Sequence, residues 1–166
     1  MNKEQFVAQL KQQEEQNAAG KTLQQADIET FQQRVGELAS RIRGWLDGVQ
    51  SVQLNVTPMT LFDETLVDKS ANSSYQIDCI TITANGRTLR LRPDALYLIG
   101  SKGCVEIEYG GVRAAGESRL YMQDREVPDG EWALVTTTVA AGNQKARSAQ
   151  IYDENAFFVL MGPLVT

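Results

Sequence analysis

The chain has 166 residues, of which 42% are hydrophobic, and this is enough apolar material for a buried core, which argues against general disorder. Its 16 basic and 21 acidic residues give a net charge of -5 without a basic block, which argues against sequence-independent binding to nucleic acid. There is no histidine, so the commonest general base, the commonest metal ligand and every Ser/His or Cys/His catalytic pair are excluded.

The first predicted element is a helix over residues 2–18. Phe6, Val7 and Leu10 form a short apolar patch on it, and the residues that follow are glutamine, glutamate and asparagine. A polar helix end of this kind is either solvated, which is the commoner case, or ordered by a partner. The candidate contact residues are Gln13, Glu14 and Gln16.

A second helix is predicted over residues 22–48. Gly20 breaks the first helix, and Thr22 with Gln25 fits the capping box that opens a new one, so the two helices form a hairpin. Large apolar residues then recur every three or four positions, which places them on one face of the helix. They are Ile28, Phe31, Val35, Leu38, Ile42, Trp45 and Val49, with Ala39 and Leu46 beside them. This widening stripe predicts packing on a broad surface such as a sheet.

The pattern then changes to the alternation that is typical of strands. A strand with one buried face is predicted over residues 52–56, and Pro58 ends it. Residues 59–74 have no clear period. They form either an irregular crossing or a short edge strand within 60–67.

Residues 75–92 predict a β-hairpin. Asn85-Gly86 lies between two alternating runs and is the preferred pair for a two-residue type I′ turn. The predicted pairs are Ile82 with Leu89 and Ile80 with Leu91 on one face, and Thr83 with Thr88, Thr81 with Arg90 and Cys79 with Arg92 on the other. The apolar residues before Cys79 are out of phase with those after it, so a bulge or burial of both faces is expected there.

Pro93-Asp94 is predicted to form a turn, and two further hairpins follow. Their strands are 96–99 and 105–109 around the loop 100–103, and 119–123 and 132–139 around a turn at 127–130. Residues 140–148 are predicted to form a loop. For the tail we favour a strand over a short helix capped by Asp153, because residues 157–161 form a continuous apolar run.

Carboxylates are the remaining candidates for catalysis or metal binding. Glu106 and Glu108 share one strand face, and further acids crowd one hairpin turn. These are Asp124, Glu126, Asp129 and Glu131. Acids on the solvent side of a strand or in a turn are ordinary, so we assign no catalytic residue, no metal ligand and no cofactor.

Three arginines form a second candidate surface. Arg87, Arg90 and Arg92 make a basic strip on the first hairpin, suited to a phosphate, a carboxylate ligand or an acidic partner. The alternative, which we favour, is an exposed face whose arginines pair with neighbouring acids such as Glu106 or Glu108.

The two cysteines lie inside strand-like runs. Buried reduced thiols are therefore expected for Cys79 and Cys104, with a single disulfide as the alternative. The N-terminus lacks the apolar run of a signal peptide, and no stretch reaches the length of a membrane span. We expect a soluble cytoplasmic protein.

These patterns predict a single α+β domain over residues 1–166, with an N-terminal helical hairpin (1–48) packed on a mainly antiparallel, barrel-like or sandwich-like curved sheet (49–166). The leading hypothesis for function is a non-enzymatic intracellular protein-binding module, such as an inhibitor, an immunity-type protein or an assembly component. Its partner is expected to be another protein, not nucleic acid or a membrane. The alternatives are a small-ligand-binding domain or carboxylate-dependent hydrolase, and a homo-oligomer assembled through the second helix. Monomer and homodimer both stay open.

Overall fold

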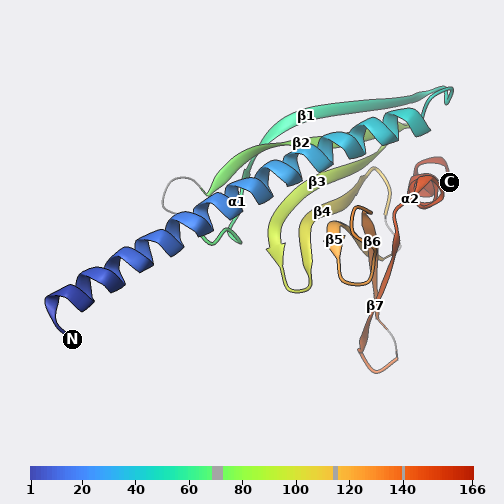
Figure 1. The fold of residues 1–166 in the computed structure, drawn as a ribbon. Helices are drawn as coiled ribbons and strands as arrows, with labels where there is room; N and C mark the ends of the chain where they lie inside the picture. The colour runs from blue at the N-terminus through green and yellow to red at the C-terminus, as the bar shows by residue number, and fades with distance from the viewer. Residues whose placement is uncertain (69–72, 114–115, 140) are drawn as a thin grey trace.

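A computed structural model describes residues 1–68, 73–113, 116–139 and 141–166, apart from the side chains of residues 21 and 22. Its elements in chain order are α1 (Lys3–Trp45), β1 (Val52–Phe62), β2 (Ser74–Ala84), β3 (Arg87–Leu98), β4 (Ser101–Gly110), β5 (Glu117–Asp124), β6 (Ala133–Val139), β7 (Lys145–Ile151) and α2 (Glu154–Val165). The long helix α1 lies along the sheet, and its N-terminal part extends well beyond it. The second helix, α2, lies at the other end of the molecule, near the C-terminal end of α1 (Figure 1).

The helix α1 is continuous over 43 residues, so the predicted helical hairpin with a break at Gly20 is wrong. A glycine inside a helix costs only up to about 1 kcal/mol relative to alanine, and the strong helix formers around it outweigh that cost. The capping box lies at the other end of the helix. The Asn2 side chain accepts a hydrogen bond from the Gln5 N–H at 2.8 Å, and the Gln5 side chain accepts one from the Asn2 N–H at 3.0 Å.

The C-terminal half of α1 packs on the sheet, as its apolar spacing predicts. The buried residues of this face are Ile28, Phe31, Val35, Leu38, Ala39 and Ile42, whereas Trp45 is half-buried and Val49 is exposed beyond the helix end. Arg34 adds a polar link to the strands. Its guanidinium donates to the carbonyl oxygens of Met122 at 3.3 Å and Gly130 at 3.2 Å, and it lies 5.4 Å from the centre of the Trp132 ring.

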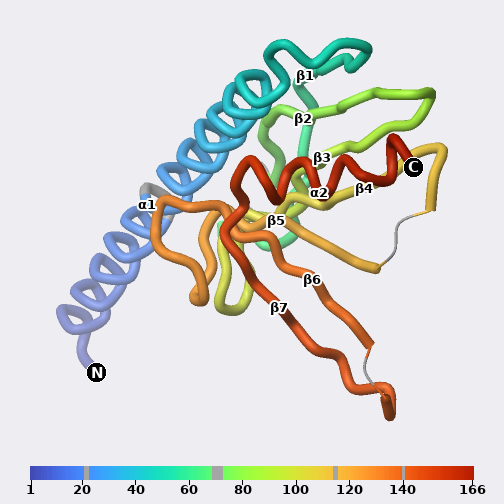
Figure 2. The backbone as a smooth tube through the Cα atoms, turned by 90° about the vertical axis from the view of Figure 1, so that its right-hand side faces the viewer, coloured from blue at the N-terminus to red at the C-terminus, as the bar shows by residue number. Residues whose placement is uncertain are grey.

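The seven strands form one sheet in the order β1 to β7, and each strand is antiparallel to its neighbours. Successive strands in the chain are thus neighbours in the sheet. The sheet is strongly curved, as Figure 2 shows, but it stays open, with β1 and β7 as its edges. The predicted α+β class with a curved antiparallel sheet is confirmed, and the sheet does not close into a barrel.

The hairpin predicted around Asn85-Gly86 is also confirmed. The structure pairs Ile82 with Leu89, Ile80 with Leu91, Thr83 with Thr88 and Thr81 with Arg90. The β2–β3 pairing begins at Ile80, so the predicted pair of Cys79 with Arg92 is not part of it. The consecutive residues Cys79 and Ile80 are both buried, which matches the expected burial of both faces at this end.

Two prolines lie inside strands, so the predictions that Pro58 ends a strand and that Pro93-Asp94 forms a turn are wrong. Pro58 lies in β1, opposite Asp78. Because β1 is an edge strand, proline can place its missing N–H on the unpaired side. Pro93 lies in β3 beside a register shift between Pro93 and Ala95, and such irregularities tolerate proline.

The C-terminal region differs from the prediction in two places. Residues 145–151 form the edge strand β7 instead of a loop, and their small and basic side chains suit an exposed edge. Residues 154–165 form α2 instead of a strand. The Asp153 carboxylate caps this helix by accepting a hydrogen bond from the Ala156 N–H at 2.9 Å. The apolar run supplies its buried face, which consists of Ala156, Phe157, Leu160, Met161 and Leu164.

Candidate functional site

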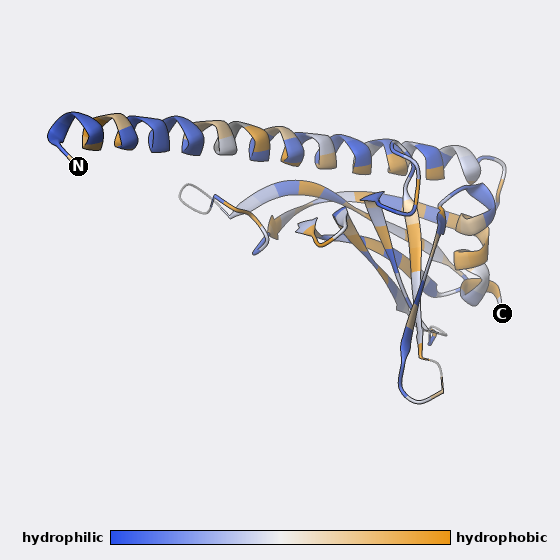
Figure 3. Ribbon diagram, turned by 60° about the horizontal axis from the view of Figure 1, so that its bottom comes forward, coloured by the Kyte–Doolittle hydropathy of each residue, from blue (hydrophilic) through white to orange (hydrophobic). Residues whose placement is uncertain are grey.

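The N-terminal half of α1 stands clear of the sheet. Residues 1–20 are all exposed, and the first buried side chain described along the helix is Gln24. We call residues 1–20 the projecting segment. At 1.5 Å per residue it extends about 30 Å. It is mostly hydrophilic and lies beyond the strands (Figure 3).

Local sequence is sufficient to keep the projecting segment helical. Alanine, leucine, glutamine, glutamate and lysine dominate it, and these residues have high helix propensity. The Asn2–Gln5 capping box satisfies N–H groups at its free end. Because the segment continues a helix that is already packed on the sheet, it does not bear the cost of nucleation. It is therefore a preformed helical surface.

The predicted contact residues Gln13, Glu14 and Gln16 all lie in this projecting segment and are exposed. The apolar patch lies near the tip of the same segment. Phe6, Val7 and Leu10 are 55%, 53% and 50% exposed. Both features lie on the one helix where the sequence predicted them, and the structure leaves this stretch exposed.

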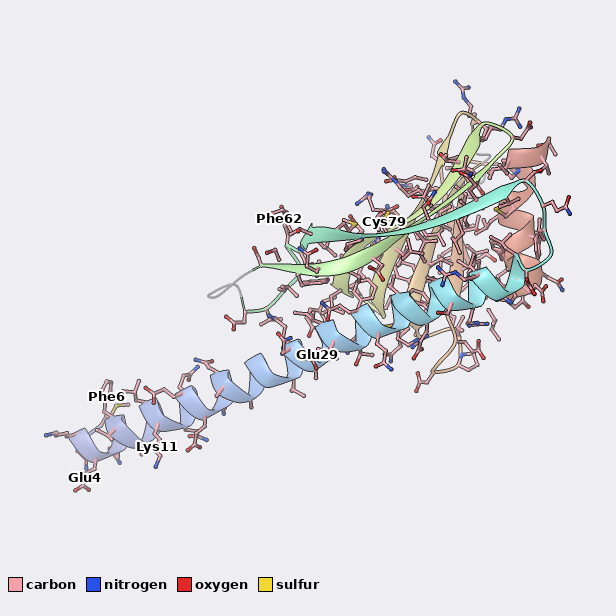
Figure 4. All side chains as sticks on the ribbon, turned by 90° about the horizontal axis from the view of Figure 1, so that it is seen from above. Glu4, Phe6, Lys11, Glu29, Phe62 and Cys79 are labelled. Carbon is pink, nitrogen blue, oxygen red and sulfur yellow. The ribbon has the colours of Figure 1, made fainter. Side chains whose placement is uncertain are left out.

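The patch lies on the face of α1 that, further along, packs on the sheet. At 100° per residue, Phe6 lies about 20° around the helix axis from the buried Phe31, and Leu10 has the same angular position as the buried Ile28. Figure 4 shows Phe6 on the sheet side of the helix, with Glu4 and Lys11 on the other side. The core face therefore continues past the point where the sheet stops covering it.

Two of the three arginines in the strip, Arg90 and Arg92, are paired with acids, which is the alternative favoured from sequence. Arg90 donates to the Glu108 carboxylate at 2.5 Å and Arg92 at 2.8 Å, and Arg92 also lies 3.6 Å from Asp94. Burial acts to raise the pKa of Glu108, but the hydrogen bonds from Arg90 and Arg92 outweigh it and lower that pKa.

Arg87 lies apart from the other two arginines. Its Nη1 donates to the Pro163 carbonyl oxygen at 2.8 Å, near the C-terminal end of α2, where helix carbonyls lack partners within the helix. Tyr109 supports the same helix, because its hydroxyl donates to the Leu160 carbonyl oxygen at 2.6 Å. Arg87 therefore holds α2 on the sheet.

We predict that Glu108→Gln lowers the free energy of unfolding by about 0.5–1 kcal/mol at pH 7, a small effect because this ion pair is partly exposed. Since folding lowers the pKa of Glu108 from its ordinary value of 4.5, its stabilising contribution is present above that pH and is lost as the pH falls through the folded pKa. Urea unfolding of the two proteins should thus give a difference that shrinks on acidification. A difference that does not depend on pH would contradict the prediction, and Glu64→Gln, an exposed loop position, is the control.

The acids of the β5–β6 turn do not form one cluster. Asp124 has a fully buried side chain and accepts hydrogen bonds from Arg147, from the Ser101 hydroxyl at 2.6 Å and from the Glu126 N–H at 3.0 Å. Asp129 is exposed, whereas Glu131 is half-buried. Asp124 therefore joins β4, β5 and β7 and has a structural role.

Only one group of three potential metal ligands occurs in the described ranges. It consists of Asp94, Cys104 and Glu106, whose ligand atoms lie within 4.8 Å of one another. Burial raises the pKa of the Cys104 thiol to about 12, which keeps it protonated, and Glu106 lies 3.0 Å from the Arg119 guanidinium. Because the Arg119 guanidinium already occupies the Glu106 carboxylate, we do not assign a metal to this group.

A hollow of about 410 Å³ lies between α2 and strands β4 to β7, and the sequence did not predict it. It opens where β4 and β5 separate beyond the pair of Glu106 with Arg119. Its apolar lining includes Ile107, Tyr109, Leu134, Val159 and Leu160. Two acids on its rim, Glu106 and Glu117, are both paired with Arg119. The position of α2 and the separation of the strands are tertiary features without a local sequence signal.

Comparisons with protein-family models, with curated proteins and with solved structures find no match to this chain. Neither of the helices in the described ranges has an apolar stretch of the length that a bilayer crossing needs. The candidate site is thus defined by its geometry, and the projecting segment is the surface that this geometry singles out.

Proposed function

We propose that this chain is a non-enzymatic, intracellular protein-binding module whose contact surface is the projecting segment. The observation that carries the proposal is a capped helix about 30 Å long with every residue from 1 to 20 exposed and an apolar patch near its tip. Proteins recognise one another through such amphipathic helices, with apolar anchors that are spaced at the helical repeat.

Two further features support the non-enzymatic and intracellular parts of the proposal. The chain has no histidine, and its buried carboxylates Asp63 and Asp124 are engaged in structural hydrogen bonds. Cys79 and Cys104 are free and buried, which suits a reducing compartment.

The test compares the full chain with a chain that lacks residues 1–17. Both are immobilised and incubated with lysate from the source cells at protein concentrations of about 1–10 µM, a range typical of transient contacts. We expect the full chain to retain proteins that the truncated chain does not. Recovery of the same proteins by both chains would contradict the proposal, and so would recovery of none by either together with a full chain that does not self-associate.

Truncation should not unfold the protein, because no side chain in residues 1–17 is buried. The melting temperatures of the two chains are expected to agree within about 2 °C. A loss of binding can then be attributed to the missing surface.

A further inference from the structure

We infer that the projecting segment pairs with its counterpart in a second copy of this chain, as two antiparallel helices. The inference rests on the proposed function, because it names the partner of the same surface. It requires that the segment be complementary to itself under a two-fold axis, since each contact in such an interface occurs twice.

The apolar patch meets this requirement when the axis passes near the level of Ala8 and Gln9. Phe6 of one copy then lies within one residue, or about 1.5 Å, of the level of Leu10 of the other, and the reverse contact follows from symmetry. Both side chains point in the direction of the core face and are half exposed in the single chain. Pairing would remove apolar surface from water at the point where the sheet no longer covers it.

The charges select the antiparallel direction. Lys3 and Glu14 lie at nearly the same angle on one flank of the helix, eleven residues apart. With the axis between positions 8 and 9, Lys3 of each copy lies level with Glu14 of the other. A parallel pair in register would instead keep Lys3 and Glu14 of the two copies eleven residues apart along the axis, so this attraction would be lost.

The projecting segment is also long enough for this antiparallel overlap. The overlap in this register covers about residues 2–15, or roughly 20 Å, and so ends before the helix reaches the body of the molecule. The first buried contact is Gln24, which donates to the Asp68 carbonyl oxygen at 3.0 Å and accepts from the Asp68 N–H at 2.9 Å. The partner helix therefore ends about nine residues before this contact, the first buried one among the described residues.

The packed half of α1 does not serve the same purpose. Its apolar residues, such as Phe31 and Leu38, are fully buried against the chain's own sheet. We therefore place self-association in residues 1–20 and not in the helix predicted over residues 22–48. The overlap is shorter than a standard interface requires, so we expect a dissociation constant on the order of 10–100 µM.

The test measures the oligomeric state of the full chain by sedimentation from about 1 to 500 µM, a range that brackets this constant. We expect a monomer–dimer equilibrium that the double variant Phe6→Glu/Leu10→Glu weakens at least about tenfold. The matched control is Ala8→Glu, which adds a charge on the opposite face of the same segment and should leave the equilibrium within about twofold of the parent chain.

A charge exchange tests the direction of pairing. Lys3→Glu should weaken the dimer several-fold, because it places two acids level with each other, and adding Glu14→Lys should restore it. Circular dichroism melting of all variants checks that the fold is unchanged. Failure of the double exchange to restore pairing would overturn the antiparallel register.

A monomer at all concentrations, or a dimer that survives Phe6→Glu/Leu10→Glu, would overturn the inference. If the chain stays monomeric while capture of lysate proteins still depends on residues 1–17, only the second copy is wrong as the partner. If neither self-association nor capture depends on the segment, the proposed function fails as well.

Discussion

Replacing Asp63 by alanine is expected to lower the free energy of unfolding by about 3–5 kcal/mol, the loss that follows when one partner of a buried charged network is removed. Asp63 is 1% exposed and follows directly after β1. Its carboxylate accepts hydrogen bonds from the Tyr75 hydroxyl at 2.6 Å, the Leu96 N–H at 2.9 Å, and the Thr65 N–H and hydroxyl at 2.9 and 2.5 Å. Alanine would leave these donors buried without this acceptor.

Urea unfolding measures the effect, with Asp63→Asn as the graded comparison and Asp129→Ala, at an exposed turn position, as the control. The asparagine keeps the shape but presents an amide group to donors, so we expect an intermediate loss of about 2 kcal/mol. A loss below about 1 kcal/mol for Asp63→Ala would show that water or neighbouring groups replace the carboxylate.

Gly103→Ala is expected to lower the free energy of unfolding by about 2–4 kcal/mol, because it combines backbone strain with overpacking. Gly103 lies in β4 with a φ of +74°, and an added Cβ would lie 2.6 Å from Met122 Cβ and 3.1 Å from the Phe31 ring. The second distance places this glycine directly beneath α1. The substitution would thus push the helix away from the sheet.

The matched comparison is Gly86→Ala. Gly86 has a nearly identical φ of +72°, but an added Cβ meets nothing within 4 Å. The decrease in the free energy of unfolding caused by Gly86→Ala should therefore reflect backbone strain alone, about 1–2 kcal/mol. The difference between the two variants in thermal or urea unfolding isolates the contact between helix and sheet. Equal losses would show that this contact adapts freely.

The sequence was most informative where neighbouring residues decide the structure. The Asn85-Gly86 turn and its flanking alternation predicted the correct pairing from Ile80 to Leu91, because the turn type sets the register of the first pairs. The sequence also favoured pairs between the exposed arginines and neighbouring acids, and Arg90 and Arg92 both bind Glu108. Arg87 escaped that prediction, since its partner belongs to α2, 76 residues away.

Single breaker residues misled the prediction where the surrounding structure outweighed them. Gly20 did not end the helix, because one glycine costs little against 43 residues of continuous hydrogen bonding. Pro58 and Pro93 did not end strands, because an edge and a register shift accommodate the missing N–H. The apolar tail became a helix instead of a strand, since an apolar run alone suits either structure and its packing decides between them.

In the projecting segment, too, some features follow from the local sequence and others from the tertiary structure. Its helical state, its capping box and its apolar patch follow from short-range sequence, because propensity, caps and side-chain spacing act within one or two turns. That Phe6 and Leu10 continue the core face without being covered was decided only by the tertiary structure. Among the described residues, the first buried side chain along α1 is Gln24, which bonds Asp68 in the segment between β1 and β2, and the place of this segment depends on strand pairings distant in the sequence.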